Sequence, residues 1–190
     1  VSSHNITNQM FMHNDIGQYK VAACAEAMKA INPDMKVHCH IEGLQAPYTL
    51  NGVCILCVDN IDLRRAIEKA NMYNPYCKAF LDFRMRLTDA QHYFAAGNNP
   101  FEIENLLATM NFSHEEAHEA TPTSACGVEL SVVYTVKAIT AFGMANMVKW
   151  MQGADYKTMA IVNMDTFTVD AFKAKPRKKK SWLETVNITT

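Results

Sequence analysis

The most constraining feature of the sequence is the apolar run Val53–Val58, VCILCV, which ends directly on Asp59 and Asn60. A strand that is apolar on both faces has to be covered on both sides. It therefore predicts a strand within a parallel sheet that lies between two layers of helices. Open α/β sheets bind ligands at the carboxyl ends of their strands. Asp59 and Asn60 are thus the first candidate site residues.

Helical and extended patterns alternate along the rest of the chain. Helices are predicted over residues 20–30, 63–73 and 128–151, and strands over 35–42, 53–58, 77–85, 89–97, 156–165 and 166–172. A long mobile connection with some helix in it is predicted over 98–125. This alternation predicts an α/β fold with three layers and a mostly parallel sheet. Residues 1–172 would form one domain, followed by a basic tail over 173–190.

Composition excludes several classes of protein. The hydrophobic fraction of 49% and the net charge of −1 are typical of a soluble globular chain, so nucleic acid is an unlikely partner. No apolar run reaches the about 18 residues that a membrane span requires. The polar N-terminal residues do not resemble a signal peptide. We therefore expect a cytoplasmic protein with reduced cysteines and no membrane contact.

Two chemical roles are open for Asp59 from the residues alone. A carboxylate at the end of a strand suits Mg²⁺, which takes one or two carboxylates and completes its coordination with water and phosphate oxygens. Asp and Asn are also good N-caps, and a helix is predicted to begin just after this position. The first role predicts a metal-bound nucleotide, and the second predicts a purely structural residue.

Several short blocks before and after this strand occur in a fixed order. They comprise Asn5, Gln9, Phe11, Asp15-Ile16-Gly17, Lys20, Ile31-Asn32-Pro33, Cys57, Asp59-Asn60 and Arg64. In these blocks the chain resembles the ThiF/MoeB/ubiquitin-activating-enzyme superfamily of ATP-dependent adenylyltransferases. The resemblance extends over roughly residues 3–170. It implies a Rossmann-like fold and, as in relatives, a homodimer.

The resemblance also implies a reaction and its cofactors. The C-terminal glycine carboxylate of a small ubiquitin-like or sulphur-carrier protein attacks the α-phosphate of ATP and expels pyrophosphate. By the family match, Asp59 would hold Mg²⁺ and Lys20 would meet the phosphates as a positive point charge. The remaining nucleotide-binding candidates are Asn5, Gln9, Asn60 and Arg64.

The sequence departs from the family pattern at two places. Asn8 stands where the family has an arginine that binds phosphate. The glycine-rich G-x-G-G-x-G-[ST] segment that precedes these blocks in the family does not occur in the sequence, although such loops cradle phosphates. We therefore expect an N-terminally truncated chain or a split protein. The alternative function is a non-catalytic interaction module, a pseudo-enzyme, on the same scaffold.

Two further motifs suggest metals. His114–His118, HEEAH, matches the zincin pattern H-E-x-x-H and makes a zinc metalloprotease a third alternative. The predicted helix around it is short and no third ligand is evident downstream, so a solvated acidic helix explains the motif better. Cys54 and Cys57 form C-x-x-C, but neighbours at this spacing in a strand point to opposite faces. No second pair exists, so no structural zinc is expected.

The last candidates lie outside the resemblance blocks. Cys126 precedes the long helix over 128–151, and some relatives carry a thiol for thioester or persulphide chemistry in this region. A helix N-terminus lowers the pKa of a thiol, which makes Cys126 a candidate acceptor; a buried structural cysteine is the alternative. The basic cluster over 173–180 predicts a solvated tail, with an electrostatic docking site for an acidic partner or nucleic acid as the alternative.

Overall fold

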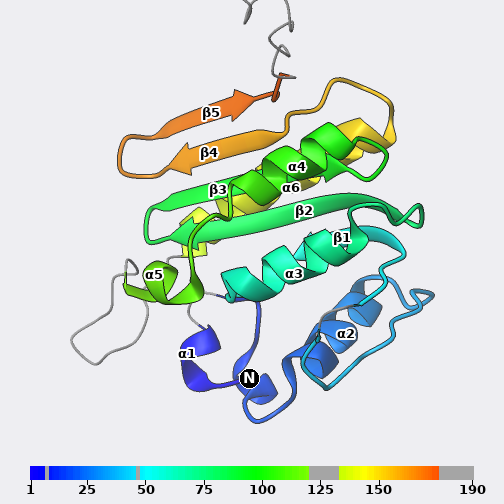
Figure 1. Ribbon diagram of the computed structural model, residues 1–190. Helices are drawn as coiled ribbons and strands as arrows, with labels where there is room; N and C mark the ends of the chain where they lie inside the picture. The colour runs from blue at the N-terminus through cyan, green and yellow to red at the C-terminus, as the bar shows by residue number, and fades with distance from the viewer. Residues whose placement is uncertain (7–8, 46–47, 120–132, 176–190) are drawn as a thin grey trace, which may run out of the picture.

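The computed structural model describes residues 1–6, 9–45, 48–119 and 133–175. In these residues one five-stranded sheet has the order β1-β2-β3-β4-β5. Helices α3 and α4 cover one face of the sheet and α6 covers the other (Figure 1). The bounds are α1 Ser3–Ile6, η1 His13–Asp15, α2 Lys20–Ile31, β1 Gly52–Leu56, α3 Ile61–Asn71, β2 Cys77–Arg86, β3 Asp89–Ala96, α4 Pro100–Ala108, α5 His114–Glu119, α6 Val133–Met151, β4 Met159–Asn163 and β5 Thr168–Phe172.

The α/β class is confirmed, but among the described strands the only parallel pair is β1–β2. Strands β1 and β2 are parallel, whereas the β2–β3, β3–β4 and β4–β5 pairs are antiparallel. Between β2 and β3 only Leu87 and Thr88 intervene, and Leu87 has a φ of 48°. Parallel strands need a crossover of about a dozen residues or more, so this short connection enforces a hairpin.

One predicted strand does not form. Residues 35–42 alternate as a strand would, yet none of them is in a strand. The reason is the position of β1, which is the first strand of the sheet and pairs on one side only, with β2. An alternating segment needs a neighbour to satisfy its backbone groups. Among the described residues no strand lies beside β1 to offer such a neighbour.

The segment over 98–125 contains two helices within its described part. Helix α4 places Ile103 and Leu106 in the core, and α5 follows after a short turn. The helix predicted over 128–151 is described from Val133, where α6 begins, to Met151. Both closing strands are confirmed, with narrower bounds than predicted.

Two apolar clusters, one on each face of the sheet, form the core. On the α3 and α4 face the buried members are Leu56, Ile61, Ile67, Cys77, Phe80, Tyr93, Ala95, Ile103, Leu106 and Met110. On the α6 face they are Ala79, Leu81, Phe83, Ala90, Phe94, Ala96, Ile139 and Val162. Alternate residues of β2 and β3 point to opposite faces, which explains why these two strands contribute to both clusters.

Gly143 lets α6 approach the sheet closely. A Cβ at this position would lie 2.3 Å from Cε1 of Phe83 and 3.3 Å from Nδ1 of His92. Both side chains are buried and their rings stack 5.4 Å apart, so neither is free to move aside.

Gly143→Ala should therefore destabilise the fold although alanine is the better helix former. We expect a loss of about 1–3 kcal/mol, the usual effect of overpacking a core, measured by urea denaturation. Gly43→Ala is the control, because a Cβ there meets nothing within 4 Å. A gain in stability for Gly143→Ala would mean that α6 can move away from the sheet without losing packing energy.

Candidate functional site

Asp59 and Asn60 lie just beyond the carboxyl end of β1, beside the parallel strand β2. Asn60 is the N-cap of α3, and its Oδ1 accepts a hydrogen bond of 2.9 Å from the backbone N–H of Leu63. Asp59 is exposed, and no hydrogen bond or ion pair engages it in the described part of the chain. The capping role that the sequence left open for Asp59 thus belongs to Asn60.

The chemistry of Asp59 fits a hydrated magnesium ion. Carboxylate oxygens are preferred Mg²⁺ ligands, and this ion needs only one or two of them because water and phosphate complete its shell. The neighbouring Asp62 is already engaged, since it lies 3.1 Å from Arg65 Nη1 and accepts a 3.3 Å hydrogen bond from the backbone of His114. Of these two carboxylates, Asp59 is the one that is free to bind a ligand.

Arg64, a predicted nucleotide contact, lies inside the fold. Its side chain is 8% exposed and forms an ion pair with Asp82 on β2. Asp82 is fully buried and also accepts hydrogen bonds of 2.9 and 2.6 Å from Arg84. This network was not predicted from the sequence. A charged residue inside the apolar run 79–83, as Asp82 is, was the signal that could have revealed it.

The other predicted contacts have different surroundings. Lys20 is exposed and is the first residue of α2. Asn5 is buried, and its Oδ1 accepts hydrogen bonds from the backbone N–H and the hydroxyl of Ser2, at 3.0 and 2.9 Å. Gln9 is exposed. No hydrogen bond or ion pair between described residues links any of the three to Asp59. Asn8 and Cys126 lie outside the described residues.

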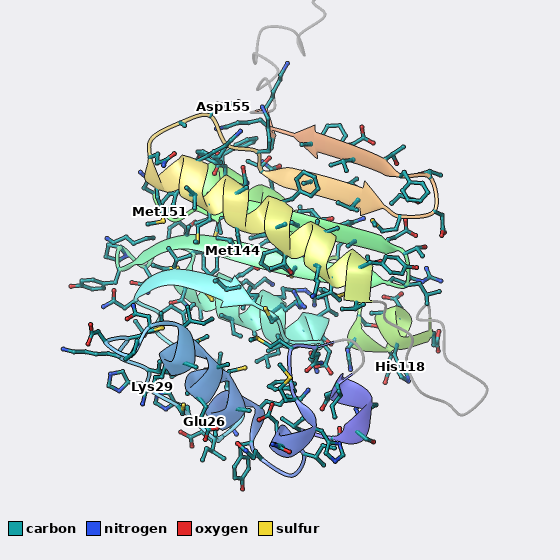
Figure 2. All side chains as sticks on the ribbon, turned by 180° about the vertical axis from the view of Figure 1, so that it is seen from behind. Glu26, Lys29, His118, Met144, Met151 and Asp155 are labelled. Carbon is teal, nitrogen blue, oxygen red and sulfur yellow. The ribbon has the colours of Figure 1, made fainter. Side chains whose placement is uncertain are left out.

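A hollow of about 700 Å³ lies on the α6 side of the sheet. It is lined by Ile6, Gln9, Met10, Phe11, Cys24, Val133, Val136, Lys137, Thr140, Ala141 and Met144. Figure 2 shows α6, which carries the labelled lining residue Met144, crossing this side of the sheet. Among the predicted site residues that the structure describes, Gln9 alone belongs to this lining. Because the lining residues are mostly apolar, the hollow suits an apolar group better than a triphosphate.

The HEEAH motif forms the short helix α5, whose start is explained by capping. Ser113 and Glu116 form a reciprocal capping box, with hydrogen bonds of 2.6 and 3.1 Å. Over residues 1–6, 9–45, 48–119 and 133–175, no group of three or more His, Cys, Asp or Glu side chains is placed to hold a metal ion. The zincin pattern therefore acquires no third ligand from this part of the chain.

The C-x-x-C pair consists of one half-buried and one exposed thiol. Cys54 points to the α3 side of β1, where burial raises the pKa of its thiol to about 12. Burial also raises the pKa of Cys57, although the nearby Arg64 opposes this effect. Thiolates, not thiols, bind metals and act as nucleophiles. At neutral pH both groups are therefore protonated.

Within the described residues no helix is both long enough and apolar enough to cross a membrane.

Residues 1–183 of the chain match the ThiF family. No curated protein gives a significant match. Two solved structures are similar: selenomethionine PaaA, with a TM-score of 0.64 and 12% identity, and E. coli MccB with ATP, with a TM-score of 0.64 and 11% identity. Each match covers 91% of this chain and 53% of the other chain. The chain thus spans about half the length of these two proteins, with which it shares the fold. Because the family match covers nearly all of its residues, the chain belongs to the ThiF family.

Proposed function

We propose that this chain carries part of the active site of an ATP-dependent adenylyltransferase. The substrate would be the C-terminal glycine carboxylate of a small ubiquitin-like or sulphur-carrier protein. The observation that carries the proposal is Asp59, an exposed and unengaged carboxylate at the carboxyl end of a strand in a ThiF-family chain. The similarity to MccB, which was solved with ATP, supports the choice of nucleotide.

Different residues of the chain would have different roles in binding Mg-ATP. Asp59 would hold Mg²⁺, and that ion supplies charge neutralisation for the triphosphate. Asn60 would set the direction of the turn, because it caps α3. The proposed transfer needs positioning and electrostatic stabilisation rather than a strong base, so a few fixed charges are sufficient.

Lys20 is the proposed phosphate contact. It is exposed at the first position of α2, and no side chain caps this helix end. The unpaired N–H groups and the positive end of the helix dipole add to the charge of the ammonium group. Both features favour an anion at this place. Cys126 as acceptor thiol, a homodimer and a cytoplasmic location complete the proposal.

Asp59→Ala should abolish magnesium-dependent ATP binding. We expect the wild-type chain to bind Mg-ATP in calorimetry. The variant should lose more than the about 10–100-fold in affinity that removal of a group orienting a metal ligand costs, because Asp59 would be the ligand itself. In EDTA the two proteins should bind ATP equally weakly. Asp170→Ala is the matched control, because Asp170 is exposed on β5 at the opposite edge of the sheet (Figure 1).

Absence of binding by the wild-type chain would refute the proposal that it carries a working nucleotide site. The competing function, a non-catalytic interaction module, would then be the favoured one. One observation favours that alternative, which is the side of β1 that the described residues leave partly exposed. Val53 and Ile55 are absent from the apolar cluster on the α3 side and are 37% and 47% exposed. Such uncovered apolar surface is typical of a docking face.

A further inference from the structure

Arg64 joins three elements of the fold at the end of β1. From α3, its Nη1 donates a 3.4 Å hydrogen bond to the carbonyl of Leu56, the last residue of β1. The same guanidinium forms an ion pair with Asp82 of β2. Residues 57–60, which carry Asp59, are the connection between Leu56 and α3. One side chain therefore links both ends of the turn that presents Asp59.

The partner of Arg64 is itself held in place. Arg84 donates hydrogen bonds of 2.9 and 2.6 Å to Asp82, and its Nη1 donates another of 3.1 Å to the carbonyl of Thr109. Its guanidinium lies 4.4 Å from the ring centroid of Tyr93. Asp82 thus has little freedom to follow a moving Arg64. Charge-assisted hydrogen bonds in a buried site are strong and directional, so the network forms a rigid clamp.

Burial decides what Arg64 can touch. The residue is 6% exposed, whereas Asp59 is exposed to solvent. An arginine that binds a triphosphate directly has to present its guanidinium to the ligand. The guanidinium of Arg64 faces Asp82 and the carbonyl of Leu56 instead.

We infer that Arg64 is a positioning residue, which holds the end of β1 and thereby sets the place of Asp59 without touching the nucleotide. The inference rests on the proposed function for its effect on Mg-ATP. The claim that Arg64 holds the turn 57–60 in place depends only on the contacts described above and not on the proposed function. Groups that orient a metal ligand typically change metal affinity about 10–100-fold when they are removed.

The chain offers a matched control in the next residue. Arg65 also lies on α3, but its guanidinium bonds to the carbonyls of Met110 and Phe112 and not to β1. Arg64→Met and Arg65→Met therefore remove the same charge and keep a similar apolar stem. Arg64→Lys keeps a cation near Asp82, and this variant carries the test if Arg64→Met does not fold.

The first readout needs no ligand. Amide hydrogen exchange and ¹H–¹⁵N spectra are compared for the folded proteins. We expect the amides of residues 57–60 to shift and to exchange faster in Arg64→Met, and to stay unchanged in Arg65→Met. Unchanged amides in Arg64→Met would overturn the inference, whether or not the chain binds Mg-ATP.

The second readout is calorimetry with Mg-ATP. We expect Arg64→Met to lose about 10–100-fold in affinity, Arg64→Lys to lose less, and Arg65→Met to change little. Adding Arg64→Met to Asp59→Ala should cause no further loss, because Arg64 acts through Asp59. Additive losses would overturn the positioning role. If the wild-type chain does not bind Mg-ATP, the proposed function fails, and the amide readout still decides whether Arg64 holds the turn.

Discussion

Asp82→Ala will lower the free energy of unfolding by about 3–5 kcal/mol, because removing one partner of a buried ion pair leaves charge without compensation. The side chain of Asp82 is fully buried between Arg64 and Arg84. Its loss would leave two guanidinium groups, 8% and 15% exposed, next to each other inside the fold. Urea denaturation followed by circular dichroism measures the change.

Asp89→Ala is the control for this variant. Asp89 is also on the β2–β3 hairpin, but it is exposed and accepts one hydrogen bond, 2.7 Å, from Asn163. Its removal should cost less than about 1 kcal/mol. If Asp82→Ala and Asp89→Ala lowered the free energy of unfolding equally, the guanidinium groups of Arg64 and Arg84 would have to be hydrated after Asp82 is removed. A triple variant with Arg64→Met, Asp82→Leu and Arg84→Met should regain stability, since apolar residues often replace a buried network without loss.

Glu68→Gln should stabilise the fold increasingly as the pH rises. Glu68 is fully buried on α3, and neither of its carboxylate oxygens has a hydrogen-bond partner among the described residues. Burial, helped by the nearby Asp82 carboxylate, raises its pKa from 4.5 to about 9. The native state thus keeps a proton that the unfolded chain releases above pH 4.5. Wild-type stability should therefore fall as the pH rises from 4.5 towards 9.

The gain for Glu68→Gln should be small near pH 5 and reach about 2–4 kcal/mol near pH 8, since one pKa unit corresponds to about 1.4 kcal/mol. Urea denaturation at the two pH values measures it. Glu26→Gln on the exposed face of α2 is the control and should show no such trend. A gain that does not depend on pH would mean that Glu68 has the same pKa in the native and unfolded states, with Arg64 and Arg84 offsetting the effect of burial.

Local patterns predicted most of the secondary structure. The runs over 53–58, 77–85 and 89–97 all form strands, because the apolar pattern of a strand reflects the two surfaces it contacts. The alternation over 35–42 was just as regular and formed none. A strand exists only where a second strand pairs with it, and pairing depends on residues far away in the sequence.

The connection over 98–125 was underestimated for a related reason. The sequence predicted a connection with some helix in it, but it did not predict that Asn99 and Pro100 begin a helix that covers the sheet. Asn99 accepts a hydrogen bond from the backbone of Glu102 as the N-cap. Loop formers and helix starters are the same residue types, so the structure they favour depends on the residues after them.

At the candidate site, the sequence by itself determined the place of Asp59 and Asn60, because the end of an apolar strand is a local feature. The tertiary structure decided what each residue does there. It assigned the cap to Asn60 and left Asp59 exposed. It also turned Arg64 inward to Asp82, which is 18 positions away along the chain. Hydropathy patterns record which face of an element is buried. The charged partner that lies on that face is set by packing, and only the folded chain shows it.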